Sequence, residues 1–375
     1  MSSATVPLVE SVREVAREQV APAAAGVDRD RRFPEESIRA LAERGALGLL
    51  VPESSGGAGG GLAVLVEACE AVGAACASSG MVFLMHSVAA ATVAGGAGER
   101  AGEYLEAMAA GSALGTLAFS ERGTGAHFYA PELAAERDNG GVRITGRKSF
   151  VTSGRHAQLY LVLVRSGGEG LDCYAVQPSD GIVFDGEWQG LGMAGNSSVA
   201  AEFDAHVDDA ARIGAAGTGG DLVFGAVAPV FLAGLAAVNV GIAAAAQQAA
   251  VDHAAGRTYP DGGSLAEIQS VQHALAELDM ATRAARLVVR DAAVLADAGD
   301  ATALVALMEA KVVATEAAQQ VTQGALEVCG GQGYARGILP VERHLRDARA
   351  GAVMAPTNGV LRTWIGKALA GLPVP

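Results

Sequence analysis

The sequence has few cationic residues and few cysteines. Lysine and arginine together number 27, against 41 aspartates and glutamates, so the formal net charge at pH 7 is −14. An acidic surface repels the phosphates of nucleic acids, and no basic run offsets this repulsion, which excludes nucleic acid as a partner. The four cysteines, at positions 69, 76, 173 and 329, match neither a metal site nor a disulfide framework. We therefore expect no bound metal and a protein of the reducing cytoplasm.

The N-terminal residues also lack an apolar signal-peptide core, because charged side chains interrupt them early. Residues 222–246, by contrast, carry no charge and are long enough to cross a bilayer. They are rich in Ala, Gly and Val, contain Pro229 and Asn239, and have no flanking cationic cluster or aromatic belt. We interpret them as a helix buried on all sides in a bundle, and we expect no membrane association.

The hydrophobic periodicity changes twice along the chain. Up to residue 112, apolar residues recur three and four apart, as in LVESVREVAREQ and EESIRALAERG, which predicts helices. Then short β-rich runs alternate with turn signals such as NGG and SDG, before the helical period returns in long Ala-rich stretches. The sequence therefore predicts an α+β fold with an N-terminal helical domain (1–112), a middle antiparallel β-barrel or sheet domain (113–218) and a C-terminal four-helix bundle (219–375).

Motif-like segments are distributed over nearly the whole chain. They are VPESSGGAGG (51–60), LAFSERGTGAH (117–127), GRKSFVTSG (146–154), LGMAGNSSVAAEFD (191–204), CGGQGYARG (329–337) and RHLRDARAGAVMAPT (343–357). In this order, and across a helix–β–helix pattern, the chain resembles the acyl-CoA dehydrogenases and their flavoprotein relatives. The resemblance implies a three-domain flavoprotein that binds FAD and oxidises an acyl thioester carried by CoA or a carrier protein. It also implies a homo-oligomer, a dimer or tetramer, and an electron-transfer partner.

The resemblance also implies a set of FAD-binding residues. In the family, hydroxyl groups of this set donate hydrogen bonds to the flavin ring, and an aromatic side chain packs on the ring. Glycines of the set allow the backbone to approach the pyrophosphate closely. The set comprises Phe119, Ser120, Phe150, Thr152, Arg257, Gln269, Gly330, Gly331 and Thr357. Arg257 would reach the flavin phosphates of a neighbouring subunit. Taken without the resemblance, Ser120, Phe150 and Thr152 are ordinary strand residues, Arg257 is a solvated cation at a helix end, and the glycine pair is a turn.

The chain departs from the family pattern where the family carries its catalytic base. The family uses a glutamate, and the matching residue here is Ala355, followed by Pro356. Some members carry the glutamate on an earlier helix, where the matching residue is Phe231. A serine that contacts the thioester ligand in the family is replaced by Ala126. Because a positioned base contributes about 10²–10⁴-fold, ordinary desaturation is expected to be slow.

Two histidines are candidates for the proton transfer. His86 lies in the apolar segment VFLMHSV, and His127 follows Ala126. The alternative for each is a structural role, which is the more common one, since a lone histidine in an apolar helix is usually a core residue. Arg346 and Asp347 are interpreted as an ion pair that holds the last helices together.

Three functions remain open at this point. The first is oxidation of an acyl thioester with a non-standard base. The second is a flavin-dependent monooxygenase on the same fold, which needs no α-proton base and receives reduced flavin from a reductase partner. The third is a catalytically silent subunit, against which the presence of Thr152, Arg257 and Thr357 argues.

Overall fold

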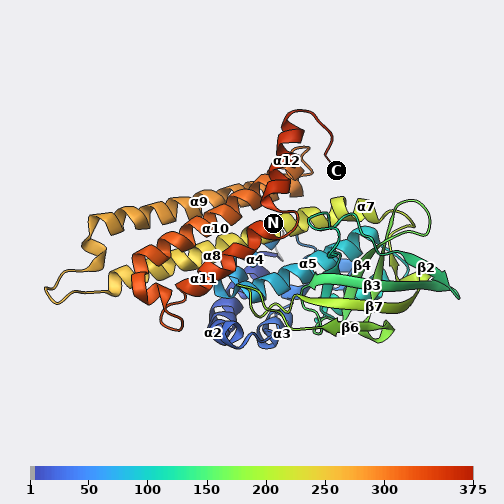
Figure 1. Ribbon diagram of the computed structural model, residues 1–375, viewed down its shortest axis with the longest axis horizontal. Helices are drawn as coiled ribbons and strands as arrows, with labels where there is room; N and C mark the ends of the chain where they lie inside the picture. The colour runs from blue at the N-terminus through green and yellow to red at the C-terminus, as the bar shows by residue number, and fades with distance from the viewer. Residues whose placement is uncertain (1–4, 375) are drawn as a thin grey trace.

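The N-terminal part of the chain is helical, as its periodicity predicts. The computed structural model describes residues 5–374. In Figure 1 the N-terminal helices lie beneath and between the other elements. Its helices are α1 (Thr5–Val15), a π-helical turn (Ala16–Val20), α2 (Ala21–Asp30), α3 (Glu35–Glu43), α4 (Leu62–Ala75), α5 (Ala77–Gly96) and α6 (Ala101–Ala109). Pro34 precedes α3, whose first turn carries Glu35 and Glu36, where acidic side chains interact favourably with the helix dipole.

The middle part forms two four-stranded sheets. The strands are β1 (Gly115–Ala118), β2 (Ala135–Asp138), β3 (Gly141–Val151), β4 (Leu159–Arg165), β5 (Leu171–Val176), β6 (Ile182–Asp185), β7 (Val199–Asp208) and β8 (Arg212–Ile213). One sheet has the order β1-β4-β5-β8 and the other β2-β3-β7-β6. Buried and more exposed residues alternate along β7, as expected for a strand with one face on a core.

One strand pair corrects the sequence-based expectation of antiparallel pairing. β1 pairs with β4 in parallel, with Gly115 opposite Leu159, whereas the other strand pairs are antiparallel. The chain between β1 and β4 passes through the second sheet before it returns, and this long connection permits a parallel pair. Turn signals, which report only local reversals, do not reveal it.

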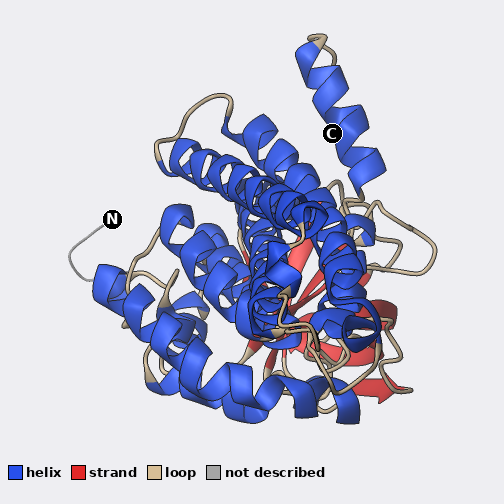
Figure 2. Cartoon of the chain, turned by 90° about the vertical axis from the view of Figure 1, so that its left-hand side faces the viewer, coloured by secondary structure: helices blue, strands red, loops and turns tan. Residues whose placement is uncertain are grey.

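The C-terminal part is helical again. It contains α7 (Gly219–Leu222), a π-helical turn (Val223–Val227), α8 (Ala228–Gly256), α9 (Gln269–Asp297), α10 (Ala303–Tyr334), α11 (Val341–Val353) and α12 (Asn358–Leu369). Helices α8 to α11 run alongside one another at the end of the molecule opposite the sheets, and α12 projects away from the body (Figures 1 and 2). In Figure 2 the helices are coloured blue and the strands red.

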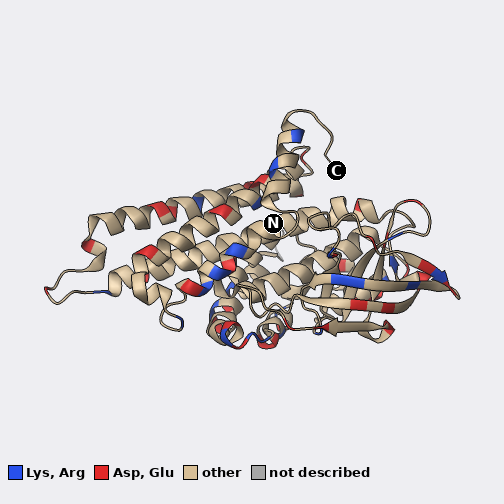
Figure 3. Ribbon diagram, in the orientation of Figure 1, with Lys and Arg blue, Asp and Glu red and all other residues tan. Residues whose placement is uncertain are grey.

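The apolar helices α5 and α8 form the centre of the molecule. Helix α5 and the helical stretch Gly219–Gly256, which includes α8, are long and apolar enough to cross a membrane, but 89% and 72% of their most apolar windows are buried in protein, as in core helices. Figure 3 shows almost no charged residues on either helix. Small residues allow close packing, since a Cβ added at Gly241 of α8 would lie 2.3 Å from the Glu70 carbonyl oxygen of α4. The charge-free segment 222–246 therefore belongs to the core.

Candidate functional site

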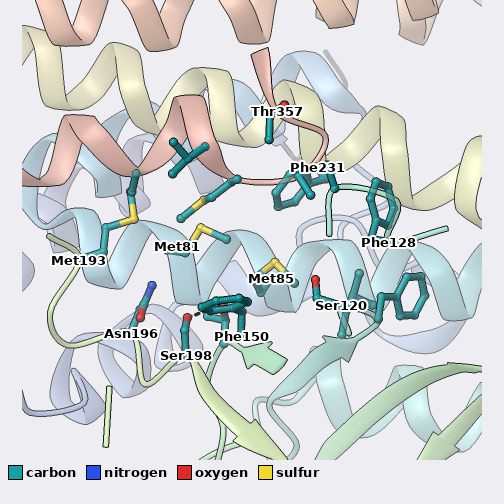
Figure 4. Close-up of a pocket in the computed structure, with 18 of the residues that line it drawn as sticks. Met81, Met85, Ser120, Phe128, Phe150, Met193, Asn196, Ser198, Phe231 and Thr357 are labelled. Atoms are coloured by element: carbon teal, nitrogen blue, oxygen red, sulfur yellow. Dashed lines mark hydrogen bonds between the residues drawn. The ribbon is translucent and has the colours of Figure 1, made fainter. Parts of the chain in front are cut away.

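A cavity of about 470 Å³ lies where the helical and β parts of the chain meet (Figure 4). This volume is within the range of small-molecule sites. Its walls come from α5, the segment after β1, the end of β3, the loop before β7, the start of α8 and the segment between α11 and α12. Apolar side chains dominate the lining, including Met81, Met85, Leu117, Phe119, Phe128, Phe150, Trp188, Met193, Val227, Phe231, Val353 and Met354.

Five of the residues predicted to bind FAD line this cavity. They are Phe119, Ser120, Phe150, Thr152 and Thr357. The Thr152 hydroxyl lies 3.0 Å from the hydroxyl of Ser198, and the Thr152 carbonyl accepts a 2.7 Å hydrogen bond from the Thr116 hydroxyl. Side chains 30 or more residues apart in sequence are thus brought together in one polar cluster against an apolar wall. Hydroxyl groups beside apolar side chains suit a flavin ring, so this set fits FAD.

The backbone around the cavity is locally strained. The pairing of β3 with β7 shifts register between Lys148 and Val151, and Phe150 in this bulge has a φ of 55°. Phe150 is 68% exposed, and its ring meets Trp188 edge to face, with ring centroids 6.4 Å apart. Met193 also lies in the left-handed region, at a φ of 48°. Bulges and unfavourable φ values concentrate at functional sites, where they direct side chains toward ligands.

A buried ion pair supports one wall of the cavity. The Lys148 ammonium contacts Glu121 at 2.5 Å and donates to the carbonyls of Phe119 and Leu163. Glu121 also accepts backbone N–H groups from residues 132 and 133 at its two carboxylate oxygens. Both oxygens of this carboxylate are therefore engaged, and the pair holds the segment that carries Ser120.

The expected ion pair between Arg346 and Asp347 does not form. Arg346 instead pairs with Asp28 at 2.6 Å and with Glu342 at 2.8 Å. Asp347 is buried and accepts the Met193 N–H at 2.5 Å, and burial raises its pKa to about 6. Consecutive residues on a helix project about 100° apart, so the two side chains reach different partners. Asp347 thereby fixes the loop that carries Met193.

The residues at the two predicted positions of the family base, Phe231 and Ala355, also line the cavity. Ala126, at the predicted position of the serine that contacts the thioester, lines it as well. The segment with Ala355 is held by Lys311, whose ammonium donates to the carbonyl of Pro356 at 3.1 Å and to the side-chain oxygen of Asn358 at 2.8 Å. Burial lowers the pKa of Lys311 to about 7. The segment is thus anchored by a cation that has no carboxylate in direct contact.

The two predicted catalytic histidines are placed differently. His86 is fully buried outside the cavity lining, where its Nδ1 accepts the Gly115 N–H at 3.1 Å and its Nε2 lies 3.0 Å from the Leu47 carbonyl. Both nitrogens are occupied, and burial lowers its pKa to about 4. This geometry favours the structural interpretation of His86. His127 is exposed, and its sequence neighbours Ala126 and Phe128 line the cavity.

The remaining predicted FAD residues lie away from this cavity. Arg257, Gln269, Gly330 and Gly331 are exposed at the ends of α8, α9 and α10. Gly330 has a φ of 54° and kinks α10, so the predicted glycine turn is a break within a helix. None of these residues lines the cavity in their own chain.

The sequence reasoning missed Asn196, Ser198 and Trp188. All three line the cavity, and the first two lie within the segment LGMAGNSSVAAEFD. The polar Asn-Ser-Ser run between apolar residues was a usable signal. Among residues 5–374 there is no group of three or more His, Cys, Asp or Glu side chains that could hold a metal ion.

Comparisons with known proteins agree with this architecture. Family models for acyl-CoA dehydrogenase match in three parts, the N-terminal domain over residues 4–112, the middle domain over 116–206 and the C-terminal domain over 233–370. An acyl-CoA dehydrogenase of Bacillus subtilis is 31% identical, with 98% of each chain covered. Cyclohex-1-ene-1-carbonyl-CoA dehydrogenase of Geobacter metallireducens is 32% identical, with 96% of each covered.

A solved structure is similar over its whole length. Butyryl-CoA dehydrogenase from Megasphaera elsdenii superposes with a TM-score of 0.92 at 25% identity, with 99% of each chain covered. The family models together match the helical, β and helical parts of the chain, and the relatives and the superposed structure cover nearly all of it. The chain therefore belongs to the acyl-CoA dehydrogenase family and is an FAD-dependent oxidoreductase of that type.

Proposed function

We propose that this enzyme oxidises an acyl thioester without a carboxylate base at either of the positions where the family carries one. The observation that supports this proposal is the cavity lining, in which positions 231 and 355 are Phe and Ala. The only carboxylate of the lining belongs to Glu121, and Lys148 and two backbone N–H groups engage it. The cavity could thus hold a flavin and an acyl chain, but its lining has no acid side chain that is free to accept a proton.

The roles of the lining residues follow from their chemistry. FAD, when bound, would supply the acceptor for the hydride that the acyl chain loses. Ser120 and Thr152 would donate hydrogen bonds to the polar edge of the flavin ring, and the exposed ring of Phe150 would pack on its face. The apolar side chains around them exclude water, which strengthens each hydrogen bond within the site.

The proton step needs a different acceptor from the usual glutamate. His127 stays a candidate because it is exposed beside two lining residues. His86 is a weaker candidate because both of its nitrogens bond to the backbone. Without a positioned base, oxidation of an unactivated saturated acyl chain should be slower by about 10²–10⁴-fold.

The test separates proton transfer from oxidation. FAD-loaded enzyme is assayed anaerobically with butyryl-CoA and octanoyl-CoA and an electron-accepting dye, and exchange of the α-hydrogens is followed in D₂O. We expect negligible dye reduction and negligible α-deuterium incorporation. The His127→Gln variant is compared with wild type on any thioester that does react. Rapid dye reduction with either simple thioester would contradict the proposal.

A monooxygenase is the second candidate, and the same lining favours it. Such an enzyme uses reduced flavin and oxygen and needs no base for the α-proton. The absence of a free carboxylate at the cavity would therefore not slow its reaction. The partner of a monooxygenase would be a flavin reductase, whereas a dehydrogenase would need an electron-transfer partner. Hydroxylation of a substrate, coupled to oxygen consumption by chemically reduced FAD on the enzyme, would support this candidate over the first.

A further inference from the structure

One polar side chain of the cavity has no hydrogen-bond partner. Asn196 is 0% exposed and lines the cavity, yet neither its side-chain oxygen nor its side-chain nitrogen bonds to any described residue. The nearby hydroxyls differ in this respect, because Thr152 and Ser198 pair with each other at 3.0 Å. A buried amide is normally satisfied, so its two vacant groups point to a ligand.

The position of Asn196 is fixed by its backbone. Its carbonyl accepts the Ser153 N–H at 2.9 Å, and its own N–H donates to the Met193 carbonyl at 3.2 Å. The preceding Gly195 donates to the Ser78 hydroxyl at 3.1 Å and is tightly enclosed, since an added Cβ would lie 2.4 Å from Val27. The amide therefore cannot move into solvent to find a partner without disrupting this loop.

Most of the cavity lining is apolar, and the Ser198 hydroxyl beside Asn196 already pairs with Thr152. Figure 4 shows Asn196 beside Ser198 at the end that carries Met193, with Phe150 between this end and the one that carries Ser120 and Phe128. A hydrocarbon chain at this end would leave the amide unpaired. Leaving a buried polar group unpaired reduces affinity by about tenfold to a hundredfold. The cavity should therefore discriminate against purely aliphatic acyl chains.

We propose that Asn196 hydrogen-bonds a polar group on the acyl portion of the substrate, one that offers N–H beside C=O as an amide does. The side-chain oxygen of Asn196 accepts from the ligand N–H, and its nitrogen donates to the ligand carbonyl. This inference rests on the proposed function, because it assumes that the cavity holds an acyl thioester. The flavin ring carries a similar N–H and C=O edge, and Thr152, a predicted FAD contact, pairs with Ser198 beside Asn196, so the experiment must separate the flavin from the acyl chain as the partner.

The experiment compares ligands of the same shape. Dithionite-reduced holoenzyme, which cannot oxidise the ligand, is titrated anaerobically by calorimetry with carbamoyl-acyl-CoA thioesters of three to six acyl carbons. Each is matched with the thioester in which an isopropyl group replaces the carboxamide. We expect wild type to prefer the carboxamide by at least tenfold at one chain length, and Asn196→Leu to lose this preference.

Two controls make the result specific. Asn239→Leu removes another buried asparagine amide that does not line the cavity, and it should keep the preference. FAD binding to the apoprotein is measured for each variant, together with thermal unfolding. If Asn196→Leu weakens FAD binding and leaves the acyl preference unchanged, the flavin is the partner and the inference is wrong.

The remaining outcomes are also decisive. Equal affinity of wild type for both members of every ligand pair would overturn the inference while leaving the proposed function intact. Failure of every thioester to bind wild-type holoenzyme would contradict the proposed function and the inference together. Retention of the carboxamide preference in Asn196→Leu would show that another residue provides it.

Discussion

Lys148 and Glu121 form an ion pair inside the β part of the chain, with the lysine side chain 0% exposed and the glutamate side chain 3% exposed. Glu121 directly follows Ser120 in the chain, and the same lysine donates to the Phe119 carbonyl. Burial lowers the pKa of Lys148, and the neighbouring carboxylate partly offsets this effect. The stability of the cavity wall therefore depends on two charges that water does not reach.

Replacing Lys148 should destabilise the protein strongly. Lys148→Met leaves the Glu121 carboxylate buried without its cation, and removing one partner of a buried pair costs about 3–5 kcal/mol. Urea unfolding monitored by circular dichroism measures the loss. Arg143→Met is the matched control, because Arg143 lies on the same strand and pairs with Asp204 at the surface. The control should lose no more than about 1 kcal/mol. Equal losses in the two variants would argue against this account.

Stability should rise with pH through the titration of Lys311. Burial lowers its pKa from 10.5 to about 7, so between these values the unfolded chain binds more protons than the folded chain. The free energy of unfolding therefore increases with pH in this window, by up to about 4 kcal/mol from pH 7 to pH 10. The nearby carboxylate of Glu316 opposes the pKa shift.

The Lys311→Met variant tests this prediction. Its unfolding free energy is measured by urea denaturation at pH 7, 8, 9 and 10 beside wild type, and the wild-type values should rise relative to the variant at each step. Other titrating groups cancel in the difference. Parallel curves for the two proteins would mean that Lys311 keeps its ordinary pKa.

Introducing an acid at position 355 should restore little desaturation. Ala355→Glu places a carboxylate in the cavity wall, but Pro356 restricts the backbone beside it. Ala126 also leaves the thioester without the expected hydroxyl contact. We expect a small, pH-dependent gain in dye reduction with butyryl-CoA, and no gain in the uncharged control Ala355→Gln. A gain in both variants would show that charge at this position is irrelevant.

The enzyme should be a dimer or tetramer. Met280, Leu287 and Val294 are 61%, 59% and 57% exposed on α9, and their spacing of seven places them along one side of the helix. Arg257, predicted to reach FAD, is exposed and does not line the cavity of its own chain. We propose that a second copy of the chain packs against this surface, and that Arg257 of one copy contacts the FAD phosphates in the other.

Light scattering of wild type and of a Met280→Lys, Leu287→Lys double variant tests the assembly. The variant should have a lower mass and bind FAD more weakly, whereas Val183→Lys, at an exposed position on β6, should change neither. A stable wild-type monomer with bound FAD would rule out the shared site.

The sequence by itself determined the order of structural classes. Hydrophobic period is a local property, so apolar residues three and four apart specified helices, and β-rich runs between turn signals specified strands. The charge-free segment 222–246 likewise required burial, because no short-range interaction satisfies so long an apolar surface in water. The ordered motifs also indicated the family and FAD, and the comparisons confirm both.

Only the tertiary structure decided which residues meet. The parallel pairing of β1 with β4, the contact of Asp347 with Met193 and the burial of His86 all depend on contacts between residues distant in sequence. The same holds for Asn196, whose vacant amide is visible only when the surrounding elements are in place. Local propensity carries no information about such contacts, because they are selected by the packing of whole elements against each other.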